Sequence, residues 1–219
     1  MNPDAPFRNR AEAGCRLAQR LKQYAHHPQV IVLGLPRGGI PVAYEVATAL
    51  GVPLDAYLVR KLGVPDHSEL AMGAIASGGL RHLNTSILQE CNIDPETLER
   101  VTQQEWKELQ RRDLKYREGR LPLSFEGQII ILVDDGIATG ATMLAALESL
   151  RQYRPKKIVV AVPVSPVETI ETLNRLADEV VCLITPTPFN AVGEWYADFS
   201  QTSDDEVCHL LSQGLRGNC

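Results

Sequence analysis

The stretch from Ile130 to Met143, IILVDDGIATGATM, decides the fold of this chain. It begins inside an apolar run over residues 128–133, which is typical of a strand buried on both faces. Two adjacent carboxylates follow, then a short loop, and then Thr-Gly-Ala-Thr opens a segment with apolar residues at helical spacing. Because ligands of parallel sheets bind where the strands end, this order predicts a ligand site at the start of the helix.

The loop in this stretch has the chemistry of an anion site. Backbone N–H groups at a helix N-terminus have no partner within the helix and lie in a field that favours negative charge. Glycine lets the backbone approach a phosphate closely, and threonine hydroxyls add two donors. No Gly-Lys-Thr or Gly-Lys-Ser follows a glycine-rich run, so this is not a P-loop. The predicted phosphate-binding residues are Ala138, Thr139, Gly140, Ala141 and Thr142.

The two carboxylates, Asp134 and Asp135, come directly after the predicted strand. Carboxylate oxygens accept hydrogen bonds from a sugar diol, and they reach a magnesium ion through water. Taken one at a time, Asp-Asp-Gly is a common turn and threonine is a common helix cap. The ordered whole instead favours a site for a sugar phosphate.

The rest of the chain alternates predicted strands and helices. Four more strands are predicted over residues 30–34, 54–60, 157–162 and 179–184. Helices are predicted over residues 10–25, 39–50, 95–117 and 140–152, and two more are opened by capping boxes at Ser165–Glu168 and Ser203–Glu206. This alternation predicts a doubly wound α/β fold with a mainly parallel, five-stranded sheet. Gly78-Gly79, between two short apolar runs, predicts a hairpin.

Two further segments carry basic residues where predicted strands end. In GLPRGGIP, residues 34–41, Arg37 stands between a proline and two glycines, so its side chain and bare backbone amides can face an anion. The alternative is a glycine-rich turn with a solvated arginine. In RKLGVPDHSELAMG, residues 60–73, Arg60 and Lys61 follow the predicted second strand, and an ordinary surface hairpin is the alternative there.

Composition excludes several classes of protein. The chain has 219 residues, 44% of them apolar, and a formal net charge of −5, so it has no basic excess for nucleic acid. Its five cysteines are widely spaced and predict neither a zinc site nor a disulfide framework. No run is apolar and long enough to cross a membrane. We expect reduced thiols in a cytoplasmic protein.

The order of these motifs resembles type I phosphoribosyltransferases, which use phosphoribosyl pyrophosphate (PRPP). The resemblance rests on FRNRAEAG, GLPRGGIPVA, VDDGIATGATM and VGEWYADFSQTSDDEV, and it is closest to a bacterial branch known mainly as predicted phosphoribosyltransferases. It implies that Asp134 and Asp135 bind the ribose hydroxyls and, with Mg²⁺, take part in catalysis alongside Lys61. It implies pyrophosphate binding by Pro36, Arg37, Gly38, Gly39 and Arg60, with a cis peptide bond between Pro36 and Arg37.

The resemblance also implies a division of the single domain, residues 1–219. The core is expected over about 28–184, a mobile arm over about 61–84, and a hood over about 185–219 together with the N-terminal helix. His67 and Glu69 are candidates for a role in the arm. Phe189, Trp195 and Tyr196 either stack on a planar acceptor base or cover an open edge of the core.

The expected reaction is transfer of the phosphoribosyl group to a nitrogen acceptor with release of pyrophosphate. Purine salvage members often have an aspartate where this chain has Ala138, so a standard hypoxanthine or guanine transferase is disfavoured. Two alternatives stay open: a binding protein that senses PRPP or a nucleotide without turnover, and a hydrolase that transfers the group to water. A homodimer is an expected assembly.

Overall fold

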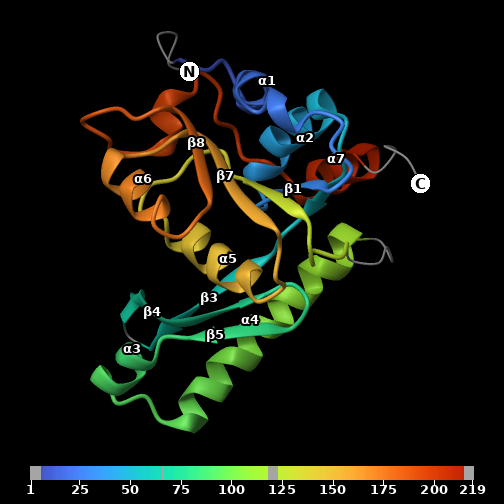
Figure 1. The fold of residues 1–219 in the computed structure, drawn as a ribbon. Coiled ribbons are helices and arrows are strands. Elements are labelled where there is room, and N and C mark those ends of the chain that lie inside the picture. The colour runs from blue at the N-terminus through green and yellow to red at the C-terminus, as the bar shows by residue number, and fades with distance from the viewer. Residues whose placement is uncertain (1–5, 66, 118–122, 215–219) are drawn as a thin grey trace.

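The computed structural model describes residues 6–65, 67–117 and 123–214. Its main sheet has five parallel strands in the order β2-β1-β6-β7-β8 (Figure 1). The strands are β1 (Val30–Gly34), β2 (Leu54–Ala56), β6 (Ile129–Val133), β7 (Lys157–Val164) and β8 (Glu179–Ile184). Every residue of β1 and β6 is buried, as continuous apolar runs require. The predicted doubly wound sheet is confirmed.

Helices cover both faces of this sheet (Figure 1). One face carries α1 (Arg10–Arg20), α2 (Gly39–Leu50) and α7 (Asp204–Gly214), and α1 lies on α2. The other face carries α5 (Ala141–Arg151) and α6 (Val167–Leu173). The helix predicted over residues 10–25 ends at Arg20, and a short 3₁₀ helix, Lys22–Tyr24, follows.

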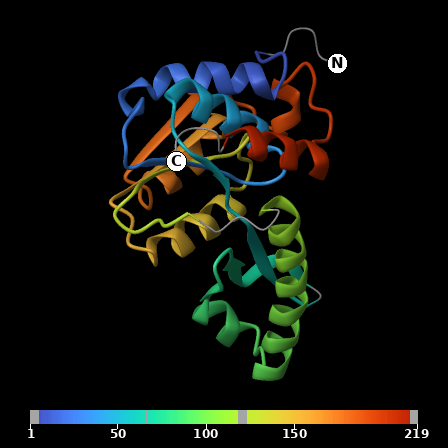
Figure 2. The same ribbon diagram turned by 90° about the vertical axis from the view of Figure 1, so that its right-hand side faces the viewer.

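A second, antiparallel sheet projects from the core (Figures 1 and 2). It consists of β3 (Val59–Val64), β4 (His67–Ala76) and β5 (Leu80–Leu83). Gly78 and Gly79 make the turn with φ of 85° and 88°, which confirms the predicted hairpin. The helices α3 (Thr85–Glu90) and α4 (Pro95–Arg117) complete this arm, and Asp94 caps α4 as expected by accepting from Thr97 N at 2.8 Å.

The strand predicted over residues 54–60 is wrong as a single element. The chain leaves the main sheet at Tyr57, whose N–H still donates to Gly34 O at 3.0 Å. Leu58 then pairs with Ser77 of the hairpin, because Ser77 N donates to Leu58 O at 2.8 Å and Leu58 N donates to the Ser77 hydroxyl at 3.1 Å. Arg60 therefore belongs to the arm and not to the end of a core strand.

The capping box predicted at Ser165–Glu168 is also wrong. Pro166, not Ser165, is the N-cap of α6. Ser165 is buried and still belongs to the end of the sheet, because its N–H donates to Ile184 O. Its hydroxyl donates to Pro166 O and does not cap the helix. The other predicted cap is present, since Glu206 N donates to the Ser203 hydroxyl at 3.1 Å. In the part of the chain that the structure describes, no helix is long and apolar enough to cross a membrane.

Candidate active site

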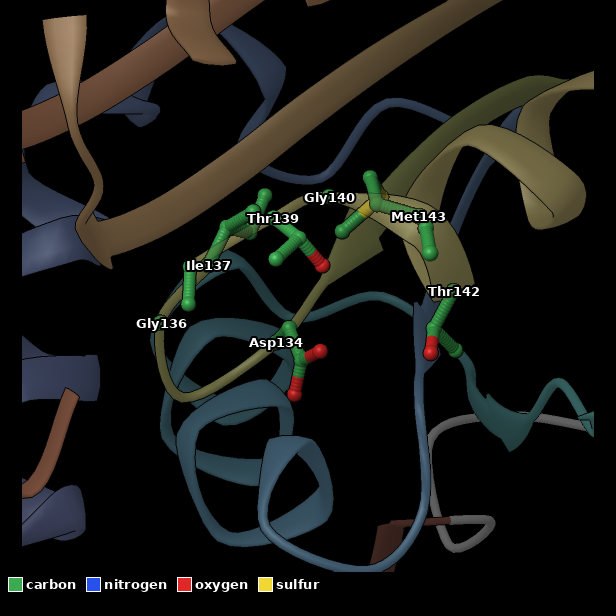
Figure 3. A pocket seen from close by; sticks show the side chains of 9 residues that line it. Asp134, Gly136, Ile137, Thr139, Gly140, Thr142 and Met143 are labelled. Carbon is green, nitrogen blue, oxygen red and sulfur yellow. The ribbon is translucent and has the colours of Figure 1, made fainter. Parts of the chain in front are cut away.

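A hollow of about 130 Å³ lies where β6 leads into α5 (Figure 3). It is lined by Asp134 and residues 136–143, so the stretch that decides the fold also forms this hollow. Glycine is required twice in the loop. A Cβ on Gly136 would lie 2.5 Å from Val192 Cγ1, and Gly140 caps α5 with φ of 80°, a conformation that other residues rarely adopt.

The loop is held from α6 by one side-chain bond. The Thr169 hydroxyl donates to Ala138 O at 2.8 Å, and a Cβ on Gly140 would lie 3.0 Å from the Thr169 methyl group. The first amides of α5 have no partner within the helix, which suits them to an anion. The hydroxyls of Thr139 and Thr142 face the same space as the Asp134 carboxylate (Figure 3). The hollow thus places anion donors beside a carboxylate.

The two aspartates differ in their surroundings. Asp134 lines the hollow, and its Oδ1 accepts from Asp135 N at 2.9 Å. Burial raises the pKa of Asp134 well above its usual range, and the neighbouring charge of Asp135 raises it further. Asp135 Oδ2 instead accepts from Arg10 Nε at 2.8 Å. Burial raises the pKa of Asp135 as well, and the Arg10 guanidinium opposes that rise.

The loop over residues 34–41 lies against this pair of aspartates. The Pro36–Arg37 peptide bond is cis, as predicted. A Cβ on Gly38 would lie 2.0 Å from Asp135 Oδ2, and one on Gly39 would lie 2.8 Å from Val133 O. The two predicted anion loops are therefore in direct contact, and only glycine leaves room for it. The Arg37 guanidinium lies 4.0 Å from Asp204 at the start of α7.

The basic residues of the arm line a second hollow. It has a volume of about 520 Å³, contains Arg60 and Lys61, and meets the first hollow at Thr142. Arg60 Nε donates to Glu105 of α4 at 2.6 Å, so this arginine is paired within the arm and not with the 34–41 loop. Lys61 is exposed.

The roles of the other two arm candidates, His67 and Glu69, stay predictions. His67 is exposed at the start of β4. The side chain of Glu69 lies outside the described residues.

The hood aromatics divide into two groups. Tyr196 is 2% exposed, packs 5.4 Å from the Phe7 ring, and donates from its hydroxyl to Asp135 O. Tyr196 therefore covers the core edge, which was one of the two interpretations of these aromatics. Phe189 and Trp195 stack on each other at 6.4 Å and are partly buried, which leaves their role in acceptor binding a prediction.

Sequence reasoning missed Arg10, whose partner is 125 residues away. A local signal existed, because Arg10 begins α1, where the helix field disfavours a cation. Thr169 and Glu105 were also missed, and neither has a motif around it that would have identified it.

Magnesium is compatible with this site. Among the described residues, no group of three or more histidines, cysteines, aspartates or glutamates is gathered to hold a metal ion. Mg²⁺ keeps several waters and uses one or two carboxylates together with substrate phosphates, so it does not need such a group. The oxygen donors of Asp134 and Asp135 have the hardness that Mg²⁺ prefers.

The parallel sheet, the hollow at the β6 tip and the glycine loop beside it form the arrangement that the sequence resemblance implies for a phosphoribosyltransferase. The chain belongs to the phosphoribosyltransferase family, because the family model described as "Phosphoribosyl transferase domain" matches residues 7–198. Enzymes of this family are glycosyltransferases.

The relatives agree with this assignment. A Mycobacterium tuberculosis protein named "Putative phosphoribosyl transferase" is 48% identical over 210 residues, which is 96% of this chain and 47% of that protein. The chain thus spans about half the length of this relative. The "Bifunctional protein PyrR" of Pseudomonas entomophila is 38% identical over 82 residues, 33% of this chain and 48% of that protein. The crystal structure of the protein TT1426 from Thermus thermophilus superposes with a TM-score of 0.85 at 43% identity, covering 94% of this chain and 98% of that chain.

Proposed function

We propose that this chain transfers the 5-phosphoribosyl group from PRPP to a nitrogen nucleophile, the ring nitrogen of a planar base, with release of pyrophosphate. The observation that carries the proposal is the hollow at the start of α5, where helix amides and threonine hydroxyls lie beside the Asp134 carboxylate. A 5-phosphate joined to a ribose needs this combination of anion donors and a diol acceptor.

Each part of the donor has a proposed partner. Residues 138–142 hold the 5-phosphate, and the carboxylate of Asp134 accepts hydrogen bonds from the ribose. Arg37 and the backbone of Gly38 and Gly39 hold the pyrophosphate. The contact of the glycine loop with Val133 O supports this, because it sets the two anion loops side by side.

The proposed chemistry is a substitution at C1 of the ribose. The bond from C1 to the pyrophosphate oxygen breaks, and its electron pair leaves with pyrophosphate. The nitrogen then forms a bond to C1 from the opposite face, which inverts the configuration. The protein positions the two reactants and stabilises charge on the leaving group. Mg²⁺, held through Asp134 and Asp135, would neutralise pyrophosphate oxygens when bound.

The arm and hood complete the proposal. Residues 61–84 would close over the donor and exclude water, bringing Lys61 and Arg60 towards the pyrophosphate. Arg60 would then leave Glu105, its present partner. The acceptor would lie under residues 185–200, near Phe189 and Trp195. Arm, hood and core would belong to one domain, whose core spans about 28–184. A cytoplasmic location and a homodimer stay predictions.

One assay tests the reaction. The protein is incubated with Mg-PRPP and a panel of nitrogenous bases, and pyrophosphate is measured. Release that depends on one base supports the transferase. Binding of PRPP without release with any base supports a regulatory binding protein, and release without a base supports a hydrolase.

A variant tests the site itself. Replacing both aspartates, Asp134→Asn with Asp135→Asn, is expected to abolish PRPP binding measured by calorimetry. Asp205→Asn is the matched control, because its carboxylate is 91% exposed on α7. Undiminished binding in the double variant would overturn the site assignment.

A further inference from the structure

The two arginines that the proposed function assigns to pyrophosphate face different carboxylates. Arg60 is hydrogen-bonded to Glu105, with 2.6 Å between Nε and Oε2. Arg37 Nη1 lies 4.0 Å from Asp204 Oδ1, which is longer than a hydrogen bond but within the range of an ion pair. At this distance the Asp204 carboxylate attracts the guanidinium of Arg37 without taking up one of its N–H donors.

Asp204 is held in place by the end of α4. The Tyr116 hydroxyl donates to Asp204 Oδ1 at 2.8 Å, and Lys115 Nζ lies 3.6 Å from Oδ2. The bond from Tyr116 lowers the pKa of Asp204 against a smaller opposing effect of burial, and the charges of Lys115 and Arg37 lower it further. Asp204 also begins α7, where the helix field favours a carboxylate. The carboxylate that faces Arg37 is therefore ionised and fixed.

The end of α4 is itself anchored in the core. It lies against α7 (Figures 1 and 2), and the Tyr116 side chain on it is only 1% exposed. The next residue, Arg117, donates to Asp55 of β2 at 2.8 Å, and these two side chains are only 9% and 11% exposed. A buried pair of this kind is costly to break. The support of Asp204 thus reaches the main sheet.

We propose that Asp204, held by Tyr116, is a positioning residue that orients Arg37 towards the pyrophosphate. The inference rests on the proposed function and adds a residue to which that function gives no role. The physical reason is side-chain entropy. An arginine that is oriented before the ligand arrives loses less freedom when it binds, so the ligand binds more tightly.

A second effect of Asp204 has the opposite sign, because a carboxylate near an anion site repels the anion. Lys115, 3.6 Å away, offsets part of this charge, and water screens it because the Asp204 side chain is 23% exposed. We therefore expect the orienting effect to be the larger one. Asp204→Asn keeps the shape of the side chain and an acceptor for Tyr116, and it should weaken Mg-pyrophosphate binding roughly 2- to 10-fold.

Calorimetry with two ligands tests the inference. Mg-pyrophosphate and ribose 5-phosphate are titrated separately into the wild type, Asp204→Asn and Asp205→Asn. Asp204→Asn should weaken pyrophosphate binding and leave ribose 5-phosphate binding unchanged. Asp205→Asn is the matched control, since it also lies beside Lys115, at 3.1 Å, but is 91% exposed, and it should bind both ligands like the wild type.

Three outcomes of this titration would overturn the inference. Tighter binding of pyrophosphate by Asp204→Asn would show that repulsion is the larger effect. Unchanged binding would show that Asp204 has no influence on the site. An equal loss for both ligands would show that the substitution loosens the protein in general.

A double-mutant cycle tests whether Asp204 acts through Arg37. Arg37→Gln should weaken Mg-pyrophosphate binding more than Asp204→Asn does. In the Arg37→Gln background, Asp204→Asn should cost nothing or tighten binding slightly, because only the repulsion is left to remove. The same loss in both backgrounds would overturn the inference.

Tyr116→Phe keeps the buried ring and removes its bond to Asp204. It should weaken Mg-pyrophosphate binding by a smaller factor than Asp204→Asn, again without a change for ribose 5-phosphate, and it decides the matter even where an Asp204 variant fails to fold. Unchanged pyrophosphate affinity in Tyr116→Phe would overturn the inference. Wild-type protein that binds neither Mg-PRPP nor Mg-pyrophosphate would instead refute the proposed function itself.

Discussion

Replacing Gly38 by alanine tests the contact between the two anion loops. Gly38 has φ of −60° and ψ of −31°, so alanine fits the backbone and any cost must come from space. The new Cβ would lie 2.0 Å from Asp135 Oδ2, about 1.4 Å short of the 3.4 Å at which ordinary contact begins. A free side chain would turn away, but Asp135 is tethered to Arg10, whose side chain is only 12% exposed.

The expected cost follows from two opposing effects. Overpacking a tight site costs about 1–3 kcal/mol, and replacing glycine where the backbone allows it returns about 0.4–1 kcal/mol. We therefore expect a net loss of about 1–2 kcal/mol in the free energy of unfolding, which lowers Tm by roughly 2–8 °C in a chain of this size. Mg-PRPP binding should weaken too, because Asp135 or the glycine loop must move.

A double-mutant cycle identifies the source of the cost. Asp135→Ala removes the three atoms that the new Cβ would meet. Gly38→Ala should then cost nothing or be slightly stabilising in that background, when both are followed by thermal and urea unfolding. The same cost with and without the Asp135 carboxylate would refute the reasoning, and so would an unchanged Tm in the single variant.

Three further predictions concern Tyr196 of the hood, Thr169 of α6 and Cys182 of β8. Tyr196→Phe should lower the free energy of unfolding by about 1–2 kcal/mol in urea denaturation, because it leaves the partly buried Asp135 carbonyl without its donor. No loss would contradict this bond. Thr169→Val keeps the shape of the side chain but removes the hydrogen bond to Ala138 O. Mg-PRPP binding should therefore weaken roughly 2- to 10-fold in calorimetry. Unchanged affinity would show that Thr169 does not support the loop. Burial raises the pKa of Cys182 to about 11. Its alkylation by iodoacetamide at pH 8, followed by mass spectrometry, should therefore be slow, and the rate should increase about tenfold per pH unit. Rapid alkylation at pH 8 would contradict the burial.

Much of the core could be predicted because its signals are local. The strands β1 and β8 have the bounds predicted from their apolar runs, and β6 differs by one residue. A continuous apolar run indicates a buried strand without any knowledge of distant residues. Short helix α3 had a usable signal too, since Asn84 caps it by accepting from Ile87 N at 3.2 Å.

The failure at residues 54–60 has a different cause. The run LDAYLVR has strand character throughout, and its two ends do form strands, in β2 and β3. What changes at Tyr57 is the partner, from Gly34 of the main sheet to Ser77 of the hairpin for the next residue. Strand propensity describes a residue and says nothing about which strand it will join, so the break could not be seen locally.

The same distinction explains which half of the site is visible in the sequence. The proposed ribose-phosphate half is built by one continuous stretch whose order of residues carries its chemistry, with a glycine loop against it. The hood is built from residues near both ends of the chain, and Arg10 and Tyr196 gain meaning only because the fold brings them to Asp135. Because the hood is fixed to the β6 tip, directly beside the proposed sugar site, substitutions that change the proposed acceptor pocket should also change PRPP affinity. The acceptor is therefore best sought with Mg-PRPP already bound.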